Sequence, residues 1–580
     1  MTRPVQLEAE MAQALRVVDD AWEELRRSPF VQQKLGITLT RLPDVSPFEA
    51  ERRSRVGRSL LQRVEAINCD RLPHKLALTL RLVRFRAQIW ARESEWYWMV
   101  VDPLGIGFFG IFLPTAYCGG WLLNVINGML AAFPFAERGD CDRYLGLVVD
   151  YAQLIQQFTA RTDGQAQRGK RMPKAQVRQA RTLLAAFKFA ARKAVAVVPE
   201  RLTAVDCGDF TRELESRVAM DLEPAFDRAL DVLSDRYLAM APDQIGLGQY
   251  SGGREIYEHL VKLHTTLDLT PEQVHAQGLA RMEEIETAMK AIRAGLGFDG
   301  DHFAFIASLS ADARWRATTV EGVTAVFQRY LERIKPHLKE YFSFIPKAPC
   351  DIAPLPAALQ SSMTFGYYDG PRPSRNQGLY LFNSGNHLKQ PLFNVASLTY
   401  HELLPGHHLH ITSQQENLLL HPFCMYSFVN AYNEGWAEYA ATLAGEIGMY
   451  EQPEERYGRL LWDKFFSTRL IVDTGLNVLG WSLERACGYM RQHSGMSEGE
   501  ILTECLRYSC DIPGQSLAYK LGDIQILALR ARMRRALGSR FDIKRFHAAI
   551  LEPGALPIPD LQWHIEHEIQ LSVGQDADPV

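Results

Sequence analysis

Apolar residues recur three and four positions apart over most of this chain, a spacing that places them on one face of an α-helix. The pattern is present in residues 8–27 and 51–67, and it continues in residues 209–241, 271–296 and 320–342. Few segments alternate apolar and polar residues in the way that a half-buried β-strand does. We therefore expect a mainly α-helical fold.

The pattern changes between residues 345 and 394. The first part of this region, IPKAPCDIAPLPAAL, is rich in proline, and the second part, SSMTFGYYDGPRPSRNQGLYLFNSGN, has the aromatic and turn residues of short strands. We expect a small β element here, directly before a His-Glu pair. Within it, Gly378–Phe382 is expected to be an edge strand that holds an extended substrate by main-chain hydrogen bonds.

The composition is that of an ordinary soluble globular protein. Hydrophobic residues make up 47% and charged residues 23% of the 580 positions. The formal net charge of −4 provides no broad basic surface, so nucleic acid is not an expected partner. The most apolar region, residues 98–135, is interrupted by Asp102, by prolines and by glycines, so we expect buried helices and turns there rather than a membrane span.

Two further features favour a cytoplasmic location. The N-terminal sequence MTRPVQLEAEMAQALRVVDD lacks the apolar run and the cleavage site of a signal peptide. The nine cysteines show no tight pairing pattern, which favours reduced thiols. We therefore expect a cytoplasmic protein that does not bind a membrane. The oligomeric state stays open.

The candidate chemistry is concentrated in residues 399–410, TYHELLPGHHLH. A zinc-hydrolase helix carries H-E-x-x-H, in which two histidines four positions apart bind one zinc ion and the Glu is the general base. Here Pro405 stands four positions after His401. In a regular helix His408 would lie about 10 Å further along the axis than His401, and His407 would point about 120° away. A regular helix therefore excludes a shared zinc ion.

The Pro405-Gly406 pair disfavours a regular helix, because proline removes a backbone donor and glycine permits unusual dihedral angles. If this pair forms a two-residue bulge, residues 401–404 and 407 together match the standard motif as H-E-L-L-H. His407 then takes the place of the second zinc ligand, and His408 supports the site or faces the substrate. We prefer His407 over His408, although the sequence leaves both open.

A third protein ligand is required, with one position left for water. The segment YNEGWAEY, residues 432–439, supplies two carboxylates one helical turn apart. Glu434 follows His407 by 27 residues, which is enough chain for one helix to end and another to return. We interpret Glu434 as the third ligand, and we expect Glu438 to orient His401 through a hydrogen bond.

Several motifs between His401 and Gly522 resemble one bacterial family. H-E-x-x-P-G-H-H-L, E-G-W-A-x-Y, V-D-T-G, G-W, R-Y and P-G-Q-x-L-x-Y-K-x-G occur in the order found in the family known as domain of unknown function eight-eight-five. N-E-G-W-A also resembles the N-E-G-F-A segment of gluzincin aminopeptidases, whose Glu is the third zinc ligand. The resemblance implies zinc on His401, His407 and Glu434, with Glu402 as the general base.

The same family resembles the thimet-oligopeptidase and Taq-type carboxypeptidase metallopeptidases. This implies a mainly α, two-lobed fold with a long cleft and a small β element before the zinc helix. We divide the chain into a mainly helical N-terminal lobe, residues 1–345, and a catalytic lobe, residues 346–580, within one continuous unit. One position departs from the family, because Asn477 stands where V-D-T-G-x is often followed by His. Asp473 of that motif and Asn477 are candidates for contacting the substrate or supporting the ligands.

The expected mechanism uses zinc to lower the pKa of a water, while Glu402 takes its proton during attack on a carbonyl. The oxyanion then needs a hydrogen-bond donor, which contributes about 3 kcal/mol. Tyr519 is our first candidate for this donor and Tyr508 the second. Arg469 and Lys520 are candidates for pairing with a substrate carboxylate.

The sequence thus predicts a zinc-dependent hydrolase that cleaves amide bonds of short peptides, like a carboxypeptidase or an oligopeptidase. Two alternatives remain. One is a zinc amidohydrolase that acts on a non-peptide amide, and the other is a catalytically inactive binding protein with the same fold. The side-chain preference and the choice between exo- and endo-cleavage stay open.

Overall fold

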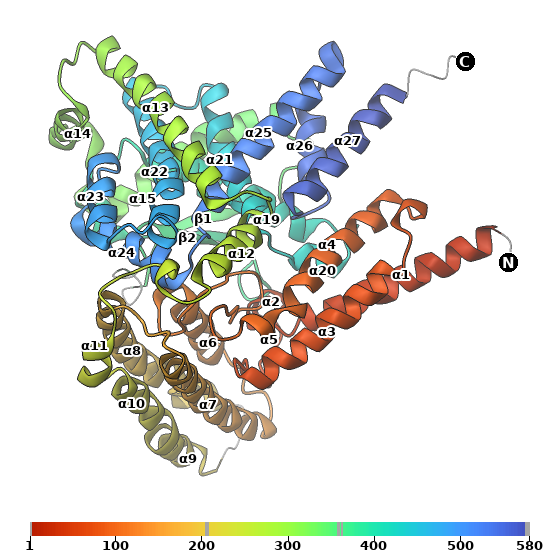
Figure 1. The fold of residues 1–580 in the computed structure, drawn as a ribbon, viewed down its shortest axis with the longest axis vertical. Helices are drawn as coiled ribbons and strands as arrows, with labels where there is room; N and C mark the ends of the chain where they lie inside the picture. Colours follow the sequence, from red (N-terminus) through yellow and green to blue (C-terminus); the bar gives the residue numbers. More distant parts are fainter. Residues whose placement is uncertain (1–2, 204–207, 357–359, 361–362, 575–580) are drawn as a thin grey trace.

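The computed structural model describes residues 3–203, 208–356, 360 and 363–574. Within these residues the fold is mainly α-helical with one small sheet, as the hydrophobic pattern predicts (Figure 1). The helices before the sheet are α1 (Arg3–Leu25), α2 (Pro29–Leu35), α3 (Pro47–Glu65), α4 (His74–Ala91), α5 (Glu93–Trp96), α6 (Trp121–Ala131), α7 (Gly139–Gln167), α8 (Lys174–Val195), α9 (Phe210–Arg217), α10 (Glu223–Val232), α11 (Asp235–Met240), α12 (Gly253–Thr265), α13 (Pro271–Gly295), α14 (His302–Ala311), α15 (Val320–Ile334) and α16 (Leu338–Tyr341).

The sheet and the remaining helices form the second part of the chain. The strands are β1 (Cys350–Pro354), β2 (Gly366–Asp369) and β3 (Gly378–Phe382). The helices that follow are α17 (Ser384–His387), α18 (Val395–Glu402), α19 (His407–Glu416), α20 (Pro422–Tyr426), α21 (Asn430–Glu446), α22 (Pro453–Asn477), α23 (Leu483–His493), α24 (Glu498–Leu506), α25 (Leu517–Leu537), α26 (Ile543–Leu551) and α27 (Ile558–Gly574).

Local chemistry explains where several helices begin. At the start of α13, the Thr270 side chain accepts from the Gln273 backbone N–H, while the Gln273 side chain accepts from the Thr270 backbone N–H. This reciprocal pair satisfies two donors that a helix N-terminus leaves free. Ser497 and Glu500 form the same arrangement at the start of α24. These ends are therefore set by the local sequence.

The sheet has the order β1-β3-β2, so β3 is its central strand. β3 pairs with β1 in parallel and with β2 in antiparallel register. The prediction that Gly378–Phe382 is an edge strand is therefore wrong. The reason lies in its burial, because Tyr380 and Phe382 pack against Phe327 of α15 and draw the strand into the interior. β2 occupies one edge of the sheet instead.

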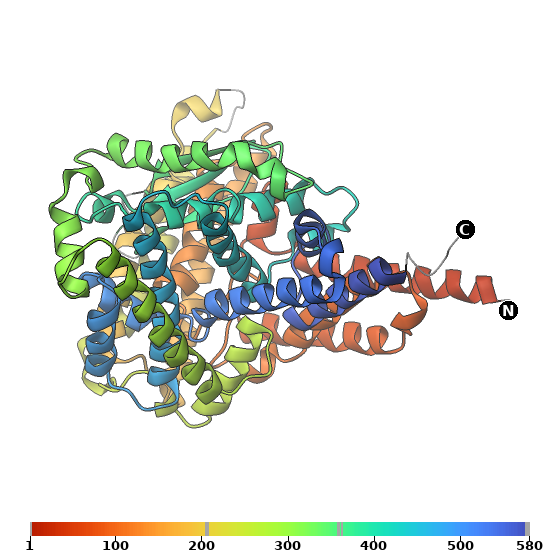
Figure 2. The same cartoon turned by 90° about the horizontal axis from the view of Figure 1, so that it is seen from above.

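One large hydrophobic core joins the two ends of the chain, since its buried residues run from Ala14 in α1 to Ile569 in α27. Figure 2 shows both terminal helices projecting on the same side of the molecule. α27 also reaches α4, where His74 Nε2 lies 2.9 Å from His564 Nδ1. The core includes residues from both sides of residue 345, and the division into lobes there stays a prediction.

Glycines let the central helices approach closely. α21 packs along α25, and α21 also contacts α19 and α22. A Cβ atom on Gly435 would overlap the backbone of Gly522, and one on Gly522 would overlap the carbonyl oxygen of Ala431. The glycines of the E-G-W-A and Y-K-x-G motifs thus serve the crossing of α21 and α25.

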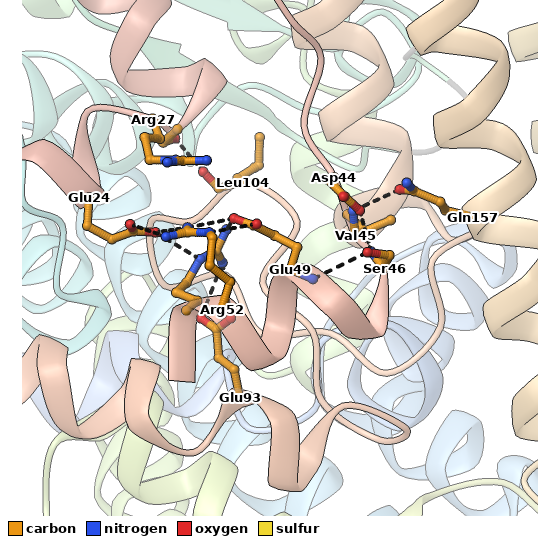
Figure 3. Close-up of polar contacts among 12 residues, drawn as sticks. Glu24, Arg27, Asp44, Val45, Ser46, Glu49, Arg52, Glu93, Leu104 and Gln157 are labelled. Atoms are coloured by element: carbon orange, nitrogen blue, oxygen red, sulfur yellow. Dashed lines mark hydrogen bonds and ion pairs between the residues drawn. The ribbon is translucent and has the colours of Figure 1, made fainter. Parts of the chain in front are cut away.

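The N-terminal helices are joined by a partly buried group of charges that we call the N-terminal ion network, Glu24, Glu49, Arg52, Arg53 and Glu93. Arg52 donates to Glu24 at 2.8 Å and to Glu49 at 2.7 Å (Figure 3), and Arg53 Nη1 lies 3.2 Å from both oxygens of Glu93. The network ties α3 to α1 and α5. It lines a cavity of about 510 Å³.

The apolar region 98–135 forms buried turns and α6, as expected. Among the described helices, none combines the length and the apolar character required to cross a membrane. The apolar residues of this region, for example Leu104, Ile111 and Leu123, instead belong to the large core.

Candidate metal centre

The histidine stretch is split between two helices. α18 ends at Glu402, Leu403 leaves the helical region with φ −106° and ψ −110°, and α19 begins at His407. The expected interruption at Pro405-Gly406 is present, but it is a break between two helices rather than a bulge within one. A Cβ atom on Gly406 would overlap the carbonyl oxygen of His401, so only glycine lets α19 start this close to the end of α18.

This break brings His401 and His407 together beside Glu434 of α21. His407 Nε2 lies 3.3 Å and His401 Nε2 3.8 Å from Glu434 Oε2, and one ligand atom from each residue lies within 4.8 Å of the others. Bonds of about 2.1 Å in a tetrahedral zinc site place neighbouring ligand atoms about 3.4 Å apart. The three residues, which we call the His-Glu cluster, therefore fit a zinc ion. No second group of this kind occurs in the described part of the chain.

Two carboxylates at the cluster have a buried oxygen that no group outside the cluster satisfies. Glu402 Oε2 has no hydrogen-bond partner, and Glu434 Oε2 faces the two histidine nitrogens of the cluster, His407 Nε2 at 3.3 Å and His401 Nε2 at 3.8 Å. Leaving a buried charged acceptor unpaired costs about 1–3 kcal/mol or more, so such atoms point to a ligand. Burial raises the pKa of Glu402, although His401 and His407 oppose this effect. Burial also acts on Glu434, but His407 and His401 outweigh it and lower the pKa.

Glu438 holds His401 in place. His401 Nδ1 lies 2.8 Å from Glu438 Oε1, and Arg459 of α22 donates to Glu438 Oε2 at 2.9 Å. Burial tends to raise the pKa of Glu438, but Arg459 and His401 outweigh burial and lower it to about 2. The ionised carboxylate thus fixes the proton of His401 on Nδ1 and directs Nε2 toward Glu434. The residue predicted to orient His401 occupies that position.

His410 supports the second histidine, and the sequence analysis did not assign it a role. Its Nε2 lies 3.0 Å from His407 Nδ1. Burial lowers the pKa of His410 well below the usual range, which keeps its imidazole neutral. Its place three positions after His407, on the same helical face, was the signal in the sequence.

His408 points away from the cluster. Its Nδ1 lies 2.8 Å from Tyr368 Oη, and its Nε2 lies 3.1 Å from the carbonyl oxygen of Ala348. A Cβ atom on Gly378 would lie 2.6 Å from His408 Nδ1, so the glycine at the start of β3 makes room for the ring. His408 therefore ties α19 to the sheet, and His407 is the histidine that meets His401 and Glu434.

A cavity of about 650 Å³ opens onto the cluster. β2 lines it along its whole length, from Gly366 to Asp369, and Leu381 of β3 contributes one side chain. Glu402 and all three members of the cluster line the same space. The cavity therefore offers a substrate both a strand edge and candidate reactive groups.

Tyr519 and Arg469 also line this cavity. The Tyr519 ring lies nearly parallel to that of His401, at an interplanar angle of 13° with 6.1 Å between ring centroids. Burial and the nearby Glu434 raise the pKa of Tyr519, which keeps its hydroxyl protonated. Tyr508, the other candidate donor, is fully buried, hydrogen-bonds to Glu504 and accepts from Arg469 Nε at 2.9 Å. It does not line the cavity.

Three further predicted residues, Lys520, Asp473 and Asn477, lie in the interior rather than at the cavity. Lys520 is held by Asp463 and Asp523, each at 2.6 Å from its Nζ, so its predicted pairing with a substrate carboxylate is wrong. Asp473 accepts from Asn477 at 3.0 Å and from backbone and hydroxyl donors around it. Burial raises the pKa of Asp473 to about 6.

Asn477 is also fully hydrogen-bonded. Its Nδ2 donates to the carbonyl oxygens of Asp473 and Tyr508, both at 2.9 Å, and its Oδ1 accepts from the Leu247 backbone N–H at 2.9 Å. It is completely buried and does not line the cavity. Asn477, the residue that differs from the family pattern, therefore takes part in packing between α22, the segment before α12 and the segment after α24.

Arg507 is the main cavity residue that the sequence analysis missed. It lines the cavity beside Tyr519 and lies over the Tyr117 ring at 4.3 Å. The R-Y motif contains it, but the sequence does not show that Tyr508 turns inward while Arg507 faces the cavity. Lys34, which pairs with Asp369 at 2.8 Å, lies at the wall of the same cavity.

The fold and the buried His-Glu cluster define a mainly helical protein with a candidate metal centre. The family described as "Bacterial protein of unknown function (DUF885)" matches residues 29–565, and the chain belongs to this family. None of the curated proteins matches the chain.

Two solved structures share the fold over nearly their whole length. One is described as a putative lipoprotein from Colwellia psychrerythraea, with a TM-score of 0.84, 22% identity, and coverage of 97% of this chain and 99% of that chain. The other is a putative lipoprotein of unknown function from Shewanella oneidensis, with a TM-score of 0.70, 15% identity, and coverage of 95% and 98%. At these identities the likeness shows the fold.

The expectation of a cytoplasmic protein is wrong. Both structural neighbours are described as lipoproteins, a class that is anchored to a membrane, and this description points away from the cytoplasm. The thiols agree with this correction. Cys141 is disulfide-bonded, whereas the other described cysteines are free. Disulfides persist mainly in oxidising compartments, so the expectation of reduced thiols is wrong at Cys141.

Proposed function

We propose that this protein is a zinc-dependent hydrolase that cleaves amide bonds of short peptides, in the manner of a carboxypeptidase or an oligopeptidase. The observation that carries the proposal is the meeting of His401, His407 and Glu434 in one cavity with the unpartnered carboxylate of Glu402. A two-histidine, one-glutamate set is a ligand set of catalytic zinc and leaves a position for water or substrate. The proposed kinship with thimet-type and Taq-type metallopeptidases rests on the same residues.

The chain supplies the groups that such a hydrolysis requires. Zinc, when bound, would supply Lewis-acid activation of water or of a carbonyl group. Glu402 has a buried, unpartnered oxygen at the cavity wall, where it takes the proton of the attacking water and returns it to the leaving amine. Tyr519 keeps its proton at neutral pH and donates a hydrogen bond to the oxyanion.

The peptide main chain would bind along β2. This strand pairs with β3 on one side only, and it lines the cavity from Gly366 to Asp369. An extended peptide adds to such an edge through main-chain hydrogen bonds. Main-chain binding of the substrate, which was expected at β3, is therefore proposed for β2. The cleft between two lobes that the family resemblance implies would be the cavity between β2 and the helices α18, α19, α21 and α22.

A comparison of wild type with Glu402→Gln tests the proposal. Both proteins should hold about one zinc ion per chain, measured by plasma mass spectrometry, because Glu402 is not a ligand. In a digest of a short-peptide library, wild type should cleave and the variant should be at least about 10³-fold slower, since it lacks the general base. Glu283→Gln, on an exposed part of α13, is the matched control.

Three results would contradict the proposal in different ways. Equal cleavage by Glu402→Gln would remove Glu402 as the base. Zinc binding with hydrolysis of non-peptide amides alone would favour an amidohydrolase. Zinc binding without any amide hydrolysis would favour a binding protein with this fold.

A further inference from the structure

Two arginines, Arg469 and Arg507, line the cavity, and both are more than nine-tenths buried. One carboxylate, Glu504, serves both arginines: its Oε2 lies 2.9 Å from Arg469 Nη2 and its Oε1 lies 3.7 Å from Arg507 Nη1. Asp511 is also near Arg507, but its oxygens accept from Thr115 and from two backbone N–H groups.

The two arginines differ in how far their donors are used. Arg469 donates to Tyr508 and Glu504, and its guanidinium lies over the rings of Phe465 and Phe466. These contacts fix its position at the cavity wall, and Glu504 balances its charge.

Arg507 keeps donors that the protein does not satisfy. Its Nη2 donates to Gln515 Oε1 at 2.6 Å and to Tyr519 Oη at 3.4 Å. Its Nε is buried and has no hydrogen-bond partner, and its Nη1 lies beyond hydrogen-bond distance of Glu504. The Tyr117 ring supports the plane of the guanidinium from one face. A buried, oriented guanidinium with unused donors is suited to bind a carboxylate through two hydrogen bonds.

Arg507 also lies close to the proposed reaction centre. Its Nη2 donates to Tyr519 Oη at 3.4 Å, and the Tyr519 ring lies nearly parallel to that of His401 with 6.1 Å between the ring centroids. An extended peptide advances about 3.3–3.6 Å per residue. A carboxylate bound at Arg507 would therefore be only one or two residues away from a carbonyl group at the His-Glu cluster.

We propose that Arg507 binds the C-terminal carboxylate of the substrate, so that the protein removes one or two residues from the C-terminus of short peptides. This inference rests on the proposed function and narrows its substrate to peptides with a free C-terminus. In the reaction the amide C–N bond breaks, the water oxygen joins the carbonyl carbon, and both water protons pass to the leaving nitrogen, which gives a carboxylate and an ammonium group. No co-reactant other than water is required.

The test compares peptides that differ only at the C-terminus, with zinc-loaded protein. The pair is an acylated tripeptide as the free acid and as the C-terminal amide. Wild type should prefer the acid by about 10- to 100-fold in kcat/KM, the size expected for hydrogen bonds to a charged group. In Arg507→Gln this preference should fall to about 1, and Arg507→Lys should keep part of it. Arg491→Gln, on the exposed face of α23, is the matched control.

A binding measurement separates this inference from the proposed function. In a Glu402→Gln background, calorimetry with the same two peptides should show tighter binding of the acid, and Arg507→Gln should abolish the difference. Zinc content and the melting temperature show whether each variant is folded. If the proposed function fails but the binding difference depends on Arg507, the carboxylate site stands without the reaction.

Two results would overturn the inference. The first is an acid-over-amide preference that persists in a folded Arg507→Gln variant, since the carboxylate would then be bound elsewhere. The second concerns an acidic side chain as the source of the carboxylate. If an amidated peptide that ends in Asp is bound and cleaved as well as the free acid, Arg507 binds a side-chain carboxylate rather than the C-terminal one.

Discussion

Two clusters of charge in this protein differ in whether they are complete. In the N-terminal ion network, the carboxylate oxygens of Glu24 and Glu49 face the guanidinium group of Arg52 (Figure 3), and those of Glu93 face Arg53. At the His-Glu cluster, Glu402 Oε2 has no partner, and Glu434 Oε2 meets the two histidine nitrogens of the cluster. Both clusters line cavities of similar size, about 510 and 650 Å³. Ligand atoms that converge on one point, more than charge or empty volume, therefore distinguish the candidate functional site.

The electrostatic surroundings differ in the same sense. At the His-Glu cluster, Arg459 compensates Glu438, so that His401 has a fixed orientation while Nε2 stays available. In the N-terminal ion network, three carboxylates share two guanidinium groups. Burial raises the pKa of Glu93 to about 7, with Arg53 opposing and Asp102 adding to the effect. The charges at the His-Glu cluster orient His401 so that its Nε2 stays available, whereas the N-terminal ion network joins helices.

The largest expected effect is on metal binding by the two adjacent histidines. His407→Ala should lose nearly all of the roughly one zinc ion per chain, because it removes one of three protein ligands. His408→Ala is the matched control: it should keep the zinc and lose only stability, since its ring bonds to Tyr368 and Ala348. Metal analysis after dialysis measures both. Zinc loss from His408→Ala with retention in His407→Ala would reverse the assignment.

A smaller effect is expected from the residue that orients His401. Glu438→Gln should weaken zinc binding by about 10- to 100-fold, because the imidazole loses the carboxylate that fixes its proton on Nδ1. Competition with a chelator gives the affinity. Glu446→Gln, on the exposed end of α21, is the control. An unchanged affinity in Glu438→Gln would mean that the compensation by Arg459 and Glu438 serves folding alone.

The smallest effect concerns Glu93 in the N-terminal ion network. Its folded-state pKa of about 7 is above the ordinary value of 4.5, so its contribution to stability is fully present below about pH 4.5 and is lost as the pH rises through about 7. Between pH 5 and pH 8, wild type should therefore lose about 1–3 kcal/mol of unfolding free energy relative to Glu93→Gln. Urea unfolding at several pH values measures this difference, and zinc content should stay the same.

If the unfolding free energies of Glu93→Gln and wild type change with pH in parallel, the arginines of the N-terminal ion network neutralise Glu93 throughout. In that case the two clusters would differ only in whether their ligand atoms converge on one point. A loss of zinc in Glu93→Gln would instead show that the two regions are coupled through the core.

The mainly helical fold and the break in the histidine stretch could be predicted from the sequence for physical reasons. Helical periodicity follows from the need to bury one face of each helix, and it survives in a single sequence. The Pro405-Gly406 pair is incompatible with a regular helix, so an interruption between His401 and His407 could be predicted. The two carboxylates of α21, one turn apart, share a helical face wherever that helix lies.

Side-chain direction could not be predicted in the same way. Lys520 and Arg469 looked equivalent as partners for a substrate carboxylate, but Lys520 meets Asp463 and Asp523 in the interior. Arg507 precedes Tyr508 in the chain, and only the packing of the π-helical turn Arg507–Asp511 turns the first toward the cavity and the second inward. Such choices depend on neighbours that are distant in sequence.

By itself, then, the sequence determined a mainly helical chain, a break in the histidine stretch, and a set of candidate zinc ligands, because these follow from backbone sterics and ligand chemistry. Only the tertiary structure decided that β3 is central and β2 the edge, that His407 rather than His408 meets Glu434, and that Arg507 faces the cavity. The physical reason is that each of these outcomes depends on which surfaces pack together, and packing joins residues that the linear chain keeps apart.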